Sequence, residues 1–171
     1  DPTYSRLWRE LGARYQDLRK WKHAKAAYKK ALEVNPQDLF AIDRIGTLEE
    51  AILDEGIAEL KEQAGKLEEG GGSEDELGAV KAKLDEAEAK AIEFKTGEYE
   101  RKVQAHPTDY ELKLVYGELL MQGGSHDQAI EQFQKAVKDP KFKVRAQNNM
   151  GKCFQKKNVH AIAIAQYQVA L

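Results

Sequence analysis

Cysteine and long apolar runs are nearly absent from this chain of 171 residues, and both absences limit what it can be. Cys153 is the single cysteine, which excludes an intramolecular disulfide and a zinc site built from several cysteines. No stretch approaches the roughly 18 consecutive apolar residues that a membrane-spanning helix needs. We therefore expect no membrane span.

The chain also lacks an excess of positive charge. Its 27 Lys and Arg residues are balanced by 29 Asp and Glu residues, for a net charge of −2. A general nucleic-acid binder normally carries a basic face, and RNA-binding helical repeats need a basic, polar inner face that is missing here. We therefore expect no nucleic-acid partner.

Proline is scarce as well, and the few prolines are regularly spaced. A proline interrupts the interior of a helix and is tolerated between helices. Steps of 34, 71 and 33 residues separate Pro2, Pro36, Pro107 and Pro140. Nearly the same steps, of 34, 71 and 34 residues, separate four glycines within helical patterns: Gly12, Gly46, Gly117 and Gly151. A fixed period of about 20 to 50 residues is typical of a stacked repeat protein.

The residues at this period form a motif. The first copy reads W-x-x-L-G-x-x-Y from Trp8 to Tyr15 and continues with Ala24, Tyr28, Ala31 and Pro36. A looser third copy has Tyr116, Gly117, Leu120, Ala129, Phe133 and Ala136, and a fourth has Met150, Gly151, Phe154, Ala163, Tyr167 and Ala170. This pattern resembles the tetratricopeptide repeat, in which each copy is a pair of antiparallel helices.

Close packing within each pair explains the small and large positions of the motif. We expect the repeated glycine on the first helix and the repeated alanine on the second helix to let the two helices approach closely. The large aromatic residues then fill the space between helices as core, rather than forming a cofactor site: Trp8, Tyr15, Tyr28, Phe133, Phe154 and Tyr167. A single pair cannot bury its apolar face, so neighbouring pairs must stack.

The second repeat is interrupted. After Gly46, a seam at heptad spacing continues through Leu53, Ile57, Leu60, Ala64 and Leu67. Three glycines at 70–72 end this helix, and Ser73 with Glu76 is a capping-box pattern that starts a new one. A second seam follows at Leu77, Val80, Leu84, Ala87, Ala91 and Phe94. We expect both helices of this repeat to be lengthened into an antiparallel hairpin, with fraying or a kink near Gly97.

These patterns predict an all-α fold, and the family resemblance implies a right-handed α-solenoid of about four helix pairs, one of them extended into a protruding, coiled-coil-like hairpin. We expect a single solenoid over residues 1–171. Its repeats are expected at 3–36, 38–107, 108–140 and 142–171, the last truncated at its C-terminus. The insertion in the second repeat is placed at about 55–91, with its tip at 70–73.

Residues that could carry catalysis or bind a cofactor are not grouped in the sequence. His126 and His160 lie 34 residues apart, so they occupy one repeat position at the turn between helices; a turn residue is the favoured interpretation and a metal pair is the alternative. Cys153 is expected to be a small buried thiol, with no basic partner close in sequence to lower its pKa. We therefore expect no enzyme activity, no cofactor and no metal site.

The resemblance implies a binding surface instead. In tetratricopeptide proteins the first helix of each pair lines the concave face. The candidate partner-binding residues at matching positions are Arg6, Arg9, Phe40, Asp43, Leu114, Glu118, Met121, Arg145, Asn148, Lys152 and Lys156. The family's two-carboxylate clamp is not matched, because Ala13 and Thr47 stand where polar donors are needed. Binding of a chaperone C-terminal tail is therefore not expected.

Two functions remain open. The first is a non-enzymatic scaffold that binds a peptide or protein partner through the concave face, the hairpin or both. The second is self-assembly into a homo-oligomer, through the hairpin or through the last helix. We expect an exposed apolar strip on that helix, formed by Ile162, Ile164, Tyr167, Val169 and Leu171. Because Asp1-Pro2 lies one period before Pro36, we also expect the chain to be a fragment that begins after another repeat.

Overall fold

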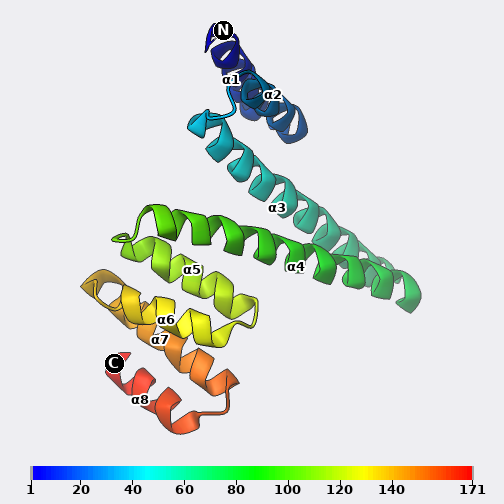
Figure 1. Ribbon diagram of the computed structural model, residues 1–171. Coiled ribbons are helices and arrows are strands. Elements are labelled where there is room, and N and C mark those ends of the chain that lie inside the picture. The colour runs from blue at the N-terminus through cyan, green and yellow to red at the C-terminus, as the bar shows by residue number, and fades with distance from the viewer. Residues whose placement is uncertain (1, 171) are drawn as a thin grey trace. The chain divides into compact units, whose positions relative to one another are not determined.

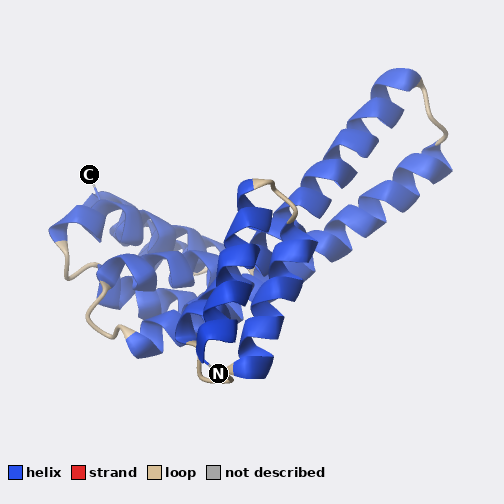
Figure 2. Cartoon of the chain, turned by 90° about the horizontal axis from the view of Figure 1, so that it is seen from above, coloured by secondary structure: helices blue, strands red, loops and turns tan. Residues whose placement is uncertain are grey.

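The computed structural model describes residues 2–170, and these residues form helices joined by short loops (Figure 1). The helices are α1 (Pro2–Asp17), α2 (Trp21–Val34), α3 (Leu39–Gly70), α4 (Glu74–Ala105), α5 (Tyr110–Gln122), α6 (His126–Ala136), α7 (Pro140–Lys156) and α8 (His160–Ala170). No strand occurs within this range, so the predicted all-α class is confirmed (Figure 2).

The same cap starts the first helix of three pairs. An aspartate precedes each of α3, α5 and α7, and its carboxylate accepts a hydrogen bond from a backbone N–H of the first turn: Asp38 from Ala41, Asp109 from Leu112 and Asp139 from Lys141. Aspartate is a preferred N-cap because it satisfies an N–H that has no partner within the helix.

The turns inside the helix pairs also repeat a backbone conformation. Arg19, Gly124 and Asn158 each have a positive φ, of 54°, 80° and 60° respectively. All three lie just before the second helix of their pair, at the same position of the repeat. The left-handed conformation reverses the chain within a few residues, which brings the second helix back along the first.

Helices α3 and α4 are each 32 residues long, whereas the other six span 11 to 17 residues. At ~1.5 Å per residue each long helix extends over roughly 48 Å. Two ion pairs join them, Lys61 with Glu88 at 2.7 Å and Lys81 with Glu68 at 2.8 Å. Both helices converge on a short loop (Figures 1 and 2).

Glycine and a capping box form that loop. Gly71 has a φ of 69°, and the N–H groups of Gly71 and Gly72 donate to the carbonyl of Leu67, which ends α3. Ser73 N–H donates to the Glu76 carboxylate at 3.1 Å, and Glu76 N–H donates to the Ser73 hydroxyl at 3.2 Å, which confirms the predicted capping box. Fraying near Gly97, one of the two outcomes expected there, does not occur: α4 continues through this residue to Ala105, because the helical hydrogen bonds tolerate the exposed glycine.

The chain divides into two compact units, Asp1–Ala91 and Ile92–Leu171. Each unit has its own core. In the first unit the buried core consists of Ala24, Tyr28, Ala31, Ala41 and Leu48. In the second unit it consists of Leu114, Leu120, Ala129, Ile130, Phe133, Ala136, Phe142, Ala146, Met150 and Cys153. Of the six aromatic residues predicted to be core, Tyr28 and Phe133 are buried and Tyr167 is half-buried. Trp8, Tyr15 and Phe154 pack against these clusters while partly exposed.

Three of the repeated glycines lie directly against aromatic rings. A Cβ atom at Gly12 would lie 2.9 Å from the Tyr28 ring, and one at Gly117 would lie 2.7 Å from the Phe133 ring. At Gly151 the corresponding distance, to the Tyr167 ring, would be 2.5 Å. These distances are shorter than van der Waals contact, so the prediction that glycine permits the close approach of paired helices is confirmed.

Candidate functional site

Three of the predicted binding residues in the first unit share one surface. Arg6, Arg9 and Phe40 line a shallow hollow of about 220 Å³, together with Glu10 and Ala13. Arg6, Arg9, Glu10 and Ala13 come from α1, and Phe40 comes from the first turn of α3. The Phe40 side chain is 45% exposed, so its ring is open to the solvent at the edge of this hollow.

The cationic groups around this hollow already have partners. The Arg9 guanidinium lies 5.5 Å from the centroid of the Phe40 ring and pairs with Asp38 at 3.4 Å. Arg44, which the sequence analysis missed, lies 5.1 Å from the same centroid, and Arg6 pairs with Glu10 at 3.5 Å. The hollow is therefore organised by contacts within the protein.

Asp38 holds α1 and α3 together. It is only 7% exposed, its carboxylate accepts a hydrogen bond from the Ser5 hydroxyl at 2.8 Å, and it caps α3. Burial by itself would raise the pKa of Asp38, but the hydrogen bonds from Ser5 and from the Ala41 N–H, with the charge of Arg9, lower it below its ordinary value. Asp43, one turn further along α3, is exposed and does not line the hollow.

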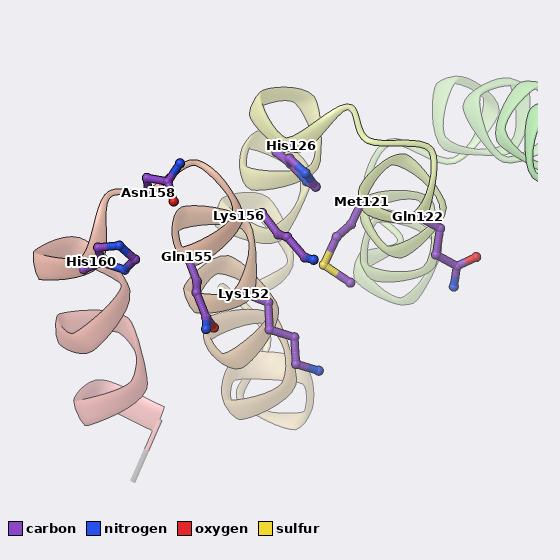
Figure 3. Close-up of a pocket in the computed structure, with 8 residues that line it drawn as sticks. All are labelled: Met121, Gln122, His126, Lys152, Gln155, Lys156, Asn158 and His160. Carbon is purple, nitrogen blue, oxygen red and sulfur yellow. The ribbon is translucent and has the colours of Figure 1, made fainter.

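A larger cleft lies in the second unit, and three other predicted residues line it. Its volume is about 600 Å³, and its lining residues are Met121, Gln122, His126, Lys152, Gln155, Lys156, Asn158 and His160. Met121 and Gln122 end α5, and the lysines lie in the last turns of α7. In Figure 3 the Lys156 side chain extends from α7 toward Met121. The cleft, named here the α5–α8 cleft, therefore combines apolar and cationic groups.

The charge of this cleft is positive. None of its eight lining residues is an aspartate or a glutamate. Neither Lys152 nor Lys156 forms an ion pair within the part of the chain that the structure describes. The adjacent Lys157 differs, because it pairs with Asp127 on α6. Two lysine charges thus remain available to a ligand.

Two more predicted residues bind each other. Arg145 on α7 donates from Nε and Nη2 to the two carboxylate oxygens of Glu118 on α5, at 2.7 and 2.6 Å. Asn149 donates to the same carboxylate at 2.8 Å. This bidentate contact connects the first helices of two neighbouring pairs. The adjacent Asn148 is exposed and does not line the α5–α8 cleft.

One predicted binding residue is wrong. Leu114 is 0% exposed and belongs to the core of the second unit. Helix α5 packs against both α6 and α7, and the apolar Leu114 side chain lies in the buried cluster that these helices share. A leucine at this repeat position is therefore covered, whereas Arg9 and Asn148, at the matching positions of other repeats, reach the solvent or a polar partner.

His126 and His160, considered above as turn residues, line the α5–α8 cleft (Figure 3). Each stands at the start of the second helix of its pair. The Nδ1 atom of His126 is buried and has no hydrogen-bond partner among residues 2–170. The 34-residue spacing of the histidines was the signal available in the sequence, because it places both at one repeat position. Asn158 at the same turn was missed.

Candidate metal ligands are not grouped among residues 2–170. Within the described range, no set of three or more His, Cys, Asp and Glu side chains is close enough to hold a metal ion. Cys153 is 0% exposed, as predicted, and burial raises the pKa of its thiol. Among residues 2–170, no helix is both long and apolar enough to cross a bilayer.

Antiparallel helix pairs with a repeated glycine–aromatic contact are characteristic of a helical-repeat protein. Comparison of the sequence with known protein families identifies the type of repeat. Residues 5–38 and residues 110–138 each match a model of the tetratricopeptide repeat. These two matches support a tetratricopeptide-repeat protein, and a repeat of this type supports a protein–protein interaction scaffold in general. No curated protein matches its sequence closely enough to count as a relative.

Solved structures support the fold. A MamA protein is 19% identical, with 98% of this chain and 90% of that chain covered and a TM-score of 0.55. YrrB, described as a TPR protein with an unusual peptide-binding site, is 23% identical, with 95% and 82% covered and a TM-score of 0.51. A second MamA structure, from MSR-1, is 14% identical, with 97% and 94% covered and a TM-score of 0.52. At these identities the likeness concerns the fold alone.

Proposed function

We propose that this chain is a non-enzymatic binding module whose α5–α8 cleft holds an acidic, extended segment of a protein partner. The observation that carries the proposal is the composition of the cleft, in which two lysines without ion-pair partners occur with no carboxylate. Opposite charge on a ligand would compensate the lysines and favour one class of partner over others.

The chemistry of the individual residues supports this ligand. Lys152 and Lys156 can each donate to a carboxylate of the segment, and Met121 offers a polarisable apolar surface that adapts to different side chains. Gln155 and Asn158 can bond the backbone of an extended peptide, whose N–H and C=O groups need partners when the peptide is bound.

A charge-reversal experiment tests the proposal. Fluorescence anisotropy would measure the affinity of labelled peptides rich in aspartate and glutamate with one leucine. The Lys152→Glu, Lys156→Glu double variant should bind about tenfold more weakly or worse, since two charge contacts of up to ~1 kcal/mol each are lost. Binding to the wild type should also weaken as salt is added.

Two exposed lysines outside the cleft provide the matched control. The Lys138→Glu, Lys143→Glu variant changes the net charge by the same amount on the same unit. It should retain the affinity of the wild type. Equal losses in both double variants would mean that only the overall charge matters, and a preference for lysine-rich peptides would rule the proposal out.

Self-assembly is the second candidate, and the surface of α8 favours it. Ile162, Ile164 and Val169 are 43%, 57% and 57% exposed, as expected for an apolar strip. Tyr167 is half-buried, and Leu171 lies outside the described residues. A concentration series by light scattering would separate the candidates, because a strictly monomeric chain would eliminate self-assembly.

A further inference from the structure

A second pocket in the same unit has a different composition. Its volume is about 300 Å³, and it is formed by the last turns of α4 with α5 and α6. Its lining residues are Glu100, Val103, Gln104, Tyr116, Leu120, Gln128, Glu131, Gln132 and Lys135, none of which lines the α5–α8 cleft. We name it the α4–α6 pocket.

One of the residues that line this pocket has a buried acceptor without a donor. The amide oxygen of Gln132 is buried and has no hydrogen-bond partner in the described part of the chain. An unsatisfied polar atom of this kind is destabilising, so native proteins normally supply it with a partner. Because an amide oxygen can only accept, the missing partner must carry an N–H or O–H group.

Two carboxylates define the charge of that partner. Glu100 on α4 and Glu131 on α6 line the pocket, and neither forms an ion pair with another described residue. Burial raises the pKa of the Tyr116 phenol, and the charge of Glu100 raises it further. The negative charge of Glu100 therefore acts on a side chain that lines this pocket. Lys135 is the single cation among the lining residues, so a negative charge remains.

The apolar residues define the remaining shape. Leu120 is 4% exposed, and Val103 and Tyr116 are half-buried, whereas both glutamates are exposed. A ligand that fits must therefore combine an aliphatic stem with a cationic head that has several donors. Arginine has this form, since its methylene groups pack on apolar surface and its guanidinium carries five N–H donors in a fixed plane.

We propose that the α4–α6 pocket is a docking site for an arginine side chain of a protein partner. The guanidinium lies between the carboxylates of Glu100 and Glu131, and its stem covers Val103 and Leu120. The Gln132 amide turns toward the pocket, so that its oxygen accepts a hydrogen bond from the guanidinium. This site is independent of the α5–α8 cleft and selects the opposite charge.

NMR titration of the full chain with Nα-acetyl-arginine amide tests this site. The expected result is a saturable shift of the Gln132 side-chain amide and of the Tyr116 backbone amide. The neutral isostere Nα-acetyl-citrulline amide should bind at least several-fold more weakly, because it keeps the shape and lacks the charge. Absence of a saturable shift up to ~50 mM, a concentration far above that needed for a millimolar ligand, would overturn the proposal and favour a water-filled pocket.

Variants assign the binding to these residues. Glu100→Gln, Glu131→Gln should weaken arginine binding by about fivefold or more, since two charge-assisted contacts become neutral. Gln132→Leu should abolish the saturable shift at Tyr116 without unfolding the chain, because it removes an unsatisfied polar atom. The matched control, Glu93→Gln, Glu111→Gln, alters two exposed glutamates outside the pocket and should leave the affinity unchanged. Equal binding by all variants, or by citrulline, would contradict the assignment.

Discussion

At the scale of single residues, the spacing of glycines in the sequence predicted where paired helices approach closely, because each repeat packs its two helices in the same way. The glycine at one position of the first helix faces an aromatic ring of the second helix in three pairs, at Gly12, Gly117 and Gly151. Gly56 and Gly97 differ, because a Cβ at either position would meet nothing within 4 Å. Glycine is therefore favourable where an aromatic ring leaves no room for a Cβ atom, and unfavourable at helical positions where a Cβ atom would fit.

Alanine substitutions separate these roles. Gly117→Ala should lower the free energy of unfolding by about 1–3 kcal/mol, because the buried Phe133 ring cannot move away from the added methyl group. Gly56→Ala should raise it by about 0.5–1 kcal/mol through helix propensity. Urea denaturation followed by circular dichroism measures both. Stabilisation by Gly117→Ala would contradict the close approach described here.

Asp38 leads to a prediction about pH. Because the pKa of its carboxyl is lowered in the folded state, Asp38 stabilises the fold above the ordinary pKa of aspartate, and this contribution is lost as the pH falls through the lower, folded-state value. Replacement by alanine should cost about 2 kcal/mol near neutral pH, from the lost cap and the lost partner of Ser5.

Asp38→Asn is the control for the charge. The amide oxygen can still cap α3, so this variant should lose less stability than Asp38→Ala at neutral pH. Its stability should also depend less on pH below about 4 than that of the wild type. Thermal unfolding between neutral and acidic pH measures the difference. Parallel stability curves for all three proteins would show that Asp38 does not titrate in this way.

At the scale of elements, local signals predicted where helices start and end. The capping box of Ser73 and Glu76 and the left-handed Gly71 were readable because their hydrogen bonds join residues a few positions apart. Local signals also suggested fraying near Gly97, and there α4 remains helical. A single exposed glycine costs only ~1 kcal/mol, which the hydrogen bonds of a 32-residue helix compensate.

Deletion of Glu55 through Ala91 tests the predicted insertion. The deletion should leave a folded protein with cooperative unfolding, because it restores a repeat of ordinary length. Circular dichroism should show lower total ellipticity and a retained transition. Loss of the transition would mean that these residues belong to a core that the remaining repeats need. A pull-down with and without the deletion would reveal whether the long helices contact a partner.

At the scale of the whole molecule, the two cores differ in size and share no residues. Among the described residues, the main buried cluster of Ile92–Leu171 contains ten residues, and that of Asp1–Ala91 contains five. Local stability follows the density of buried apolar contacts. Helices α5, α6 and α7 should therefore be the most protected part of the chain.

Hydrogen–deuterium exchange measures this gradient. Amides in α5–α7 should exchange slowest, and those near residues 66–78, where the side chains are mostly exposed, should exchange fastest among the helical segments. Uniform protection along the chain would instead indicate a single cooperative unit.

The sequence by itself determined the repeat, its all-α class and most of the core, because periodic spacing, caps and glycine turns act over short distances along the chain. It also indicated Met121, Lys152 and Lys156 as surface positions. Only the tertiary structure decided which of these positions are available. Leu114 is covered by neighbouring helices, Arg145 and Glu118 neutralise each other, and Gln132 keeps a buried oxygen without a donor. These outcomes depend on contacts between residues that are distant in the chain. The helical period predicts on which face of a helix a residue lies, but it does not predict which side chains of another helix pack against that face.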